Sequence, residues 1–279
     1  MKRRSVDGRP YFCTGNHLFP DCITISETPW CKFLFEVENK LHKSSCTEVY
    51  YQAGLQSTES NMLLELLAQI ISEPCFSTLR TKEQLGYIVF SGVRRANGAH
   101  GLRIIVQSDR HPEYVEQRIK AFLDSMLHQV SVMKEEEFNR HKESLATQRL
   151  EKPKMLTTLF AVFWNEISSQ QYNFDRTDIE VAHLRTIKKE QILKFYKEMI
   201  QSETQHKLSV YVLSTVEDSE SVEKDIVKPD KDLDTSDTTD TIEHKKIDDI
   251  LTFKLSQSLY PLLKPFNDIP RKGAHSSKL

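Results

Sequence analysis

Residues 72–90, SEPCFSTLRTKEQLGYIVF, constrain the fold of this chain more than any other segment. Pro74 indicates the end of one helix, the next residues favour a second short helix, and Gly86 precedes an apolar strand. Arg80 and Tyr87 lie seven positions apart, next to the start of that strand. A guanidinium and a phenol there could donate hydrogen bonds to a ligand. The residues alone favour a structural role for both, with the arginine near a helix end and the tyrosine packed in a strand.

The remaining sequence predicts an α+β domain. Several segments have the composition or alternation of strands: residues 32–36, 48–54, 87–92, 102–108 and 207–214. Others have helical periodicity: residues 60–72, a helix that opens at Pro112, residues 134–150, a helix after Pro153, and residues 189–200. The strands and helices are segregated and no βα unit repeats, which favours antiparallel pairing.

Three of these helices carry an apolar stripe typical of amphipathic helices. In chain order, the stripes are Met62, Leu63, Leu66, Leu67, Ile70 and Ile71; Tyr114, Val115, Ile119, Phe122, Leu123 and Met126; and Leu156, Leu159, Phe160, Phe163, Trp164 and Ile167. We expect the second stripe to be the inner face of its helix.

Composition divides the chain into four parts. Residues 1–31 are rich in glycine and proline without a clear period, so we expect an extended segment or the tail of a preceding domain. Residues 32–216 form the α+β domain. Residues 217–249 are rich in Asp, Ser, Thr and Lys, and such a segment buries too little apolar surface to order itself, which predicts a disordered acidic loop. Residues 250–279 recover apolar character and are interpreted as a C-terminal strap and tail.

Charge and cysteine content exclude several classes of protein. A formal net charge of −2 gives no indication of a nucleic-acid partner or an anionic membrane. No apolar run approaches the length of a membrane span, and the basic N-terminus lacks the apolar core of a signal peptide. The five cysteines form no CxxC pair, which suits reduced thiols in the cytoplasm.

The histidines do not form a zinc motif. The chain has ten, and no two lie within ten positions of each other, so neither HxxEH nor HExxH occurs. A zinc site assembled from distant histidines has a low prior, and each is better interpreted as a surface or helix residue. The sequence therefore predicts no metal ligand and no cofactor in this chain.

Residues 56–92, QSTESNMLLELLAQIISEPCFSTLRTKEQLGYIVFSG, resemble the fourth domain of the two-lobed zinc peptidases of family M16. RRANG at 94–98, ISSQQYNFDR at 167–176, ILKFYKEM at 192–199 and TFKLSQSLYPLLKP at 252–265 extend the resemblance in the same order. The resemblance implies the family's LuxS-like α+β domain, a mainly antiparallel sheet with helices packed on one face.

The resemblance also implies a division of labour. In the family an inverted HxxEH motif and a downstream glutamate hold the catalytic zinc in the first quarter of the enzyme, which would place zinc on an N-terminal half that is missing here. Arg80 and Tyr87 match positions that reach from the second half toward the cleavage site. The implied roles are an arginine fork on a peptide carbonyl or carboxylate, and a tyrosine hydroxyl on the oxygen that gains charge.

Three further features are weaker. Arg149, Lys152 and Lys154 correspond to a basic patch that resembles a nucleotide or polyphosphate site, but Met155 replaces one of its lysines, so a solvated linker is favoured over anion binding. Residues 109–114 are better interpreted as a turn into a helix than as a functional motif. Ser277, Lys278 and Leu279 match a peroxisomal address, which adds a peroxisomal alternative to the cytoplasmic location.

Three functions follow, in order of preference. The first is the substrate-binding, non-zinc portion of a zinc metalloendopeptidase that cleaves peptides, with an N-terminal catalytic half as its partner. The second is a stand-alone, inactive regulatory or peptide-binding module that pairs with such a half or forms a dimer. The third, a free-standing hydrolase, lacks a nucleophile or metal constellation. We expect the isolated chain to be inactive and to bind no stoichiometric zinc.

Overall fold

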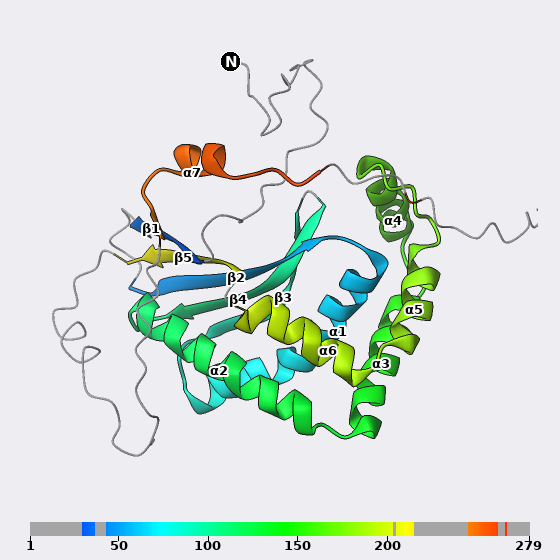
Figure 1. Cartoon of the computed structure of the whole chain (residues 1–279), viewed down its shortest axis with the longest axis horizontal. Coiled ribbons are helices and arrows are strands. Elements are labelled where there is room, and N and C mark those ends of the chain that lie inside the picture. The colour runs from blue at the N-terminus through cyan, green and yellow to red at the C-terminus, as the bar shows by residue number, and fades with distance from the viewer. Residues whose placement is uncertain are drawn as a thin grey trace, which may run out of the picture.

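Figure 1 shows a computed structural model of the chain, which describes residues 30–36, 43–96, 98–202, 205–214, 245–261 and 266. Strands from both ends of this range form one sheet, with the spatial order β3-β4-β2-β5-β1-β6. The strands are β1 Trp30–Glu36, β2 Ser45–Leu55, β3 Ile88–Ala96, β4 Ala99–Ser108, β5 His206–Leu213 and β6 Lys245–Ile247.

The sheet is antiparallel on one side and parallel on the other. β3 pairs with β4, β4 with β2, and β2 with β5, all antiparallel. β1 then pairs in parallel with both β5 and β6, so β1 and β2 are not neighbours. The turn between β3 and β4 includes Gly98, whose φ of 88° favours glycine. The α+β fold class is confirmed.

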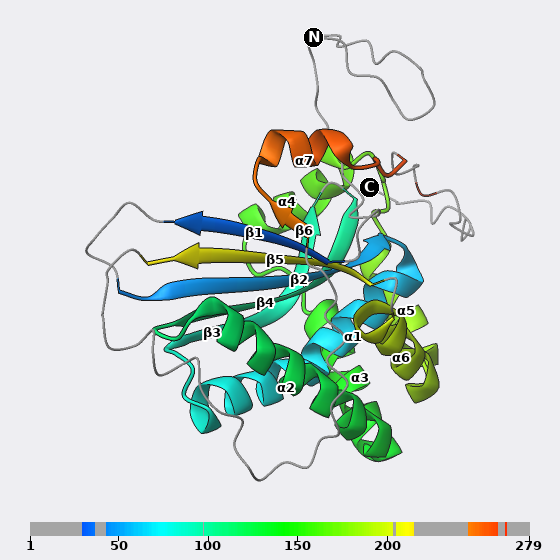
Figure 2. The ribbon, with the colours of Figure 1, turned by 60° about the vertical axis from the view of Figure 1, so that its left-hand side comes forward.

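Most helices lie on one face of the sheet, as predicted. The helical elements are α1 Thr58–Cys75, the π-helix η1 Phe76–Lys82, α2 Pro112–Val132, α3 Glu135–Leu150, α4 Leu156–Ser168, α5 Arg176–Thr186, α6 Lys189–Tyr196, the π-helix η2 Lys197–Gln201 and α7 Ile250–Ser256. α1, α2 and α6 cover the sheet, and α3 and α5 lie beyond them (Figure 1). α7 lies on the opposite face, where its Phe253 packs near Cys31 and Ile247 (Figure 2).

Helix α1 is the centre of the core. All six residues of its predicted stripe are buried. Ser57 caps its first turn by accepting a hydrogen bond from the backbone N–H of Ser60 at 3.1 Å. The continuous helix Thr58–Lys82 is long and apolar enough to cross a membrane, but 56% of the 18-residue apolar segment on which this rests is buried within the domain. We therefore interpret it as a core helix.

Pro74 does not end this helix, contrary to the sequence prediction. The chain passes through Pro74 and continues as η1 to Lys82. Proline removes one intrahelical hydrogen bond, but Ile71, Cys75 and Leu79 around it are fully buried in the core. Their packing outweighs the local cost, and the backbone continues with the wider π-helical pitch. The predicted second short helix is η1.

The prediction omitted α5, which has little apolar periodicity and buries only Glu180, Val181 and Leu184. β6 lies at the end of the predicted acidic loop, and the rest of that loop is outside the described residues. Residues 1–29, with most of the predicted N-terminal segment, also lie outside them, as do Ser277, Lys278 and Leu279.

Burial of His100 predicts a dependence of stability on pH. Its side chain is fully buried, with Nε2 2.6 Å from the Ser60 hydroxyl oxygen. Burial, and then the nearby charge of Arg95, lower the pKa of His100 from 6.5 to about 4. The folded state therefore favours the neutral ring. Stability is complete above the unfolded pKa of 6.5 and is lost as pH falls toward 4, by about 2 kcal/mol between pH 7 and pH 5.

Urea unfolding at pH 7 and pH 5 checks this expectation. His100→Gln has no titrating ring, so its loss of stability between the two pH values should be smaller by most of that amount. An equal loss in the variant and in the unaltered chain would contradict the assignment.

Candidate functional site

The structure brings Arg80 and Tyr87 together. Arg80 lies in η1, and Tyr87 directly precedes β3. The guanidinium carbon of Arg80 is 4.6 Å from the centroid of the Tyr87 ring and 4.7 Å from the centroid of the Phe76 ring. Phe76 is four residues before Arg80, so it lies on the same helical face. The two aromatic rings therefore hold the guanidinium by cation–π contacts.

The polar atoms of this pair are available to a ligand. Tyr87 is 81% exposed. In the part of the chain that the structure describes, no hydrogen bond or ion pair engages the Arg80 guanidinium or the Tyr87 hydroxyl. Aromatic rings cover a guanidinium through its faces and leave the N–H groups at its edge free to form two parallel hydrogen bonds. The pair can thus bind a carboxylate or a carbonyl oxygen.

The loop from residue 83 to residue 87 fixes the position of Tyr87. Glu83 accepts hydrogen bonds from Nε and Nη2 of Arg118 in α2, at 2.9 and 2.8 Å. Leu85 is buried, and its carbonyl accepts a hydrogen bond from the Ser108 hydroxyl. A two-point ion pair and a buried anchor restrict the motion of a short loop. Tyr87 is therefore presented from a supported position.

Gly86 lets this loop approach β4 closely. A Cβ atom at this position would lie 1.7 Å from the carbonyl oxygen of Gln107, which is backbone and cannot rotate away. Only glycine allows the loop and the strand to come so near to each other.

β3 is one of the two edge strands of the described sheet and begins beside this pair. An edge strand has backbone N–H and C=O groups that can pair with an added strand. An extended peptide can bind in this way. Ile88 and Phe90, at the start of β3, are about half exposed and offer apolar contacts next to Tyr87. The arrangement can therefore bind an extended peptide and place one of its carbonyl groups near Arg80 and Tyr87.

Metal ligands do not cluster in the described residues, where no group of three His, Cys, Asp or Glu side chains could hold an ion. His17, His42, His244 and His275 lie outside those residues. The described part of the chain thus does not fit a zinc site.

The predicted anion-binding residues are largely engaged in ion pairs. Arg149 Nη2 lies 2.7 Å from Glu65 and 2.6 Å from Glu180. Lys154 pairs with Glu151 at 2.7 Å, and Lys152 is exposed. Two carboxylates already neutralise Arg149, which favours a structural role for this residue. Anion binding at Arg149, Lys152 and Lys154 stays a prediction.

Comparison with known proteins relates the fold of this chain to a family of peptidases. The family described as "PQQ synthase PqqF-like, C-terminal lobe domain 4" matches residues 66–164. Insulin-degrading enzyme of Drosophila melanogaster is 46% identical over 246 residues, 88% of this chain and 24% of that protein. The human enzyme is 49% identical over 235 residues, 84% of this chain and 23% of that protein. This chain is homologous to the C-terminal part of insulin-degrading enzyme.

The chain spans about a quarter of the length of these insulin-degrading enzymes. Zinc proteases are among its homologues, including one from Schizosaccharomyces pombe that is 39% identical over 181 residues, 64% of the chain and 19% of that protein. The crystal structure of pitrilysin has the same fold, with a TM-score of 0.68 at 18% identity over 88% of this chain and 24% of that one. The predicted family and fold are confirmed.

Proposed function

We propose that this chain is the substrate-binding, non-zinc portion of an insulin-degrading-enzyme-like zinc metalloendopeptidase. Homology to the C-terminal part of insulin-degrading enzyme supports the peptidase assignment. The observation that carries the binding role is the Arg80–Tyr87 pair, with its donors free, beside an edge strand. The proposed ligands are peptides, and the proposed partner is the N-terminal half, which would supply the zinc and activate the attacking water.

The residues of this chain bind and orient the peptide. The backbone of β3 pairs with the extended peptide, and the exposed side chains of Ile88 and Phe90 contact its apolar groups. The Arg80 fork then holds one peptide carbonyl or carboxylate. The Tyr87 hydroxyl donates a hydrogen bond to the oxygen that gains charge as the peptide bond is attacked, and a positioned donor of this kind stabilises the transition state.

Loss of either donor should lower turnover. In a complex with a catalytic half, we expect Tyr87→Phe and Arg80→Ala each to reduce kcat for peptide cleavage by more than about tenfold. Tyr87→Phe keeps the aromatic ring against Arg80, so it tests the hydroxyl alone. Steady-state kinetics on a mid-sized peptide such as insulin measure the effect.

Tyr172→Phe is the matched control, because Tyr172 is exposed in the loop after α4 and should leave kcat unchanged. Unaltered kinetics in both site variants would reject the roles proposed for Arg80 and Tyr87.

The alternative is an inactive module that regulates a catalytic half or competes for it, and the short span of the chain relative to the enzymes it matches keeps this alternative open. Adding the chain to a catalytic half separates the two functions: a substrate-binding portion restores cleavage of a peptide, whereas a regulatory module leaves it unchanged or lowers it.

A further inference from the structure

Helix α4 turns its apolar side away from the domain. Its apolar residues recur at the spacing of a single helical face, and we call them the α4 stripe: Leu156, Leu159, Phe160, Phe163, Trp164 and Ile167. Each is between 39% and 81% exposed, and the only buried residue of α4 is Glu166. An amphipathic helix normally places its apolar face in the core. In α4 this orientation is reversed. The helix lies at the margin of the domain (Figure 1).

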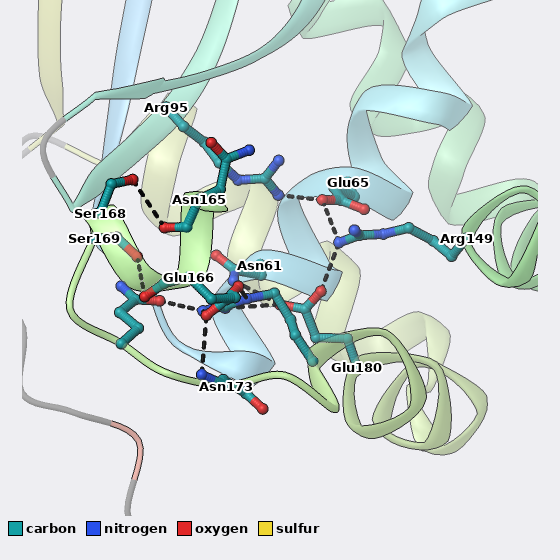
Figure 3. Close-up of polar contacts among 12 residues, drawn as sticks. Asn61, Glu65, Arg95, Arg149, Asn165, Glu166, Ser168, Ser169, Asn173 and Glu180 are labelled. Atoms are coloured by element: carbon teal, nitrogen blue, oxygen red, sulfur yellow. Dashed lines mark hydrogen bonds and ion pairs between the residues drawn. The ribbon is translucent and has the colours of Figure 1, made fainter. Parts of the chain in front are cut away.

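A polar network fixes this reversed orientation. Glu166 accepts hydrogen bonds from Nη2 of Arg176 at 2.9 Å and from the backbone N–H of Asn173 at 3.1 Å. Arg176 also contacts Glu180 of α5 at 3.4 Å. Figure 3 shows Glu166 and Glu180 close together, with Asn173 beside Glu166. The buried, paired carboxylate is thus the point where α4 joins the domain, and the apolar face must point outward.

The network reaches well into the domain. Glu180 accepts a hydrogen bond from Asn61 of α1 at 2.8 Å and pairs with Arg149 of α3 at 2.6 Å. Arg149 and Arg95 both pair with Glu65 of α1 (Figure 3). α4 is therefore connected to three other helices and to β3, and its orientation is built into the fold.

The α4 stripe has the composition of a protein interface. The rings of Phe160 and Trp164 stack with centroids 5.8 Å apart, and Phe163 lies 6.1 Å from Phe174. Exposed clusters of this kind mark interaction sites, and aromatic side chains carry much of the binding energy at interfaces. The stripe contains no charged residue, which is typical of the buried centre of a permanent interface.

We propose that the α4 stripe is the surface on which the remainder of the peptidase packs, namely the polypeptide that precedes this region in insulin-degrading enzymes. This inference rests on the proposed function. This chain matches about a quarter of the length of these relatives, and the remaining length offers a partner surface large enough to cover an exposed apolar face. A membrane fits less well, because helices that lie on membranes carry Lys or Arg on their polar face, and α4 has neither.

Association can be measured without any peptide. The tagged chain is co-expressed with the part of Drosophila insulin-degrading enzyme that precedes the matched region, and the affinity of the purified complex is measured by titration. We expect the double variant Phe160→Asp and Trp164→Asp to weaken association by at least about tenfold. Because both side chains already face solvent, the unfolding midpoint of the isolated variant should stay unchanged.

Val132→Asp is the matched control, since Val132 is a 64% exposed apolar residue at the end of α2, away from the stripe, and should bind normally. In the complex, the backbone amides of α4 should also become protected from hydrogen exchange.

Several results would overturn the inference. The first two are that the stripe variant and the unaltered chain bind with equal affinity, or that the unaltered chain forms no complex. The other two are that the chain forms a homodimer that only the stripe variant disrupts, or that it binds lipid vesicles through the stripe. A complex that forms through the stripe but cleaves no peptide would uphold the inference and count against the proposed function. Arg80→Ala should leave complex formation unchanged, which separates the test of association from the test of peptide cleavage.

Discussion

Replacing Glu180 with alanine is expected to lower the free energy of unfolding by about 3 to 5 kcal/mol, the loss typical of a broken buried ion pair. Glu180 is 1% exposed and is the shared acceptor for Asn61, Arg149 and Arg176. Removing its carboxylate leaves an amide and two guanidinium groups without one of their partners in a part of the domain from which water is largely excluded. Such unpaired buried groups cost more than the pair itself contributes.

Urea unfolding followed by circular dichroism measures the change. Glu151→Ala is the matched control, since it also removes a paired glutamate, but the Glu151–Lys154 pair is exposed to solvent. Exposed pairs of this kind contribute less than about 1 kcal/mol, so the control should unfold at nearly the urea concentration of the unaltered chain. Equal stability of Glu180→Ala and Glu151→Ala would show that the network around Glu180 contributes little.

Gly86→Ala is expected to cost about 3 kcal/mol or more, although it adds only a methyl group. That methyl group would lie 1.7 Å from the Gln107 carbonyl oxygen. The loop must therefore move away from β4, and this movement disturbs the buried Leu85 and the hydrogen bond that its carbonyl accepts from Ser108. We expect reduced peptide binding as well, because Tyr87 is the next residue.

Gly92→Ala provides the comparison within the same hairpin. Its added Cβ would lie 2.9 Å from a ring atom of Phe90, a side chain about half exposed and able to rotate. Thermal unfolding should place this variant near the unaltered chain and Gly86→Ala well below it. A Gly86→Ala protein as stable as Gly92→Ala would mean that the loop and β4 separate at little cost.

The sequence predicted those elements whose periodicity and packing agree. The first helix was correct because its apolar stripe at Met62, Leu63, Leu66 and the residues that follow is also its buried face. The opening of α2 at Pro112 was correct because local backbone chemistry determines it. In these cases local preference and tertiary structure favour the same conformation.

Where tertiary contacts determine the local structure, the sequence was insufficient to predict it. Pro74 is locally a helix terminator, yet the core carries the helix through it. α5 lacks periodicity because its inward residues include Glu180, which is buried through ion pairs with Arg149 of α3 and Arg176 of α5. The stripe of α4 was found, but nothing in its spacing shows that Glu166, on the other side, faces the domain.

The candidate site depended on the family resemblance. Arg80 and Tyr87 could not have been selected from their residue types, since arginine near a helix end and tyrosine near a strand are common. The resemblance named both residues. The cation–π contact of Phe76 with Arg80 was not predicted. The spacing of four residues indicates it, because residues four apart lie on the same face of a helix.

The parallel side of the sheet has a consequence for synthesis of the chain on the ribosome. β1, WCKFLFE, has its sheet neighbours β5 and β6 near the other end of the sequence, whereas β2, β3 and β4 follow one another closely. β2, β3 and β4 can therefore pair early, while the apolar β1, which precedes them, waits for its partners. Nascent chains halted before β5 should expose this strand, so a chaperone that binds extended apolar segments is expected to engage it until β5 has been synthesised.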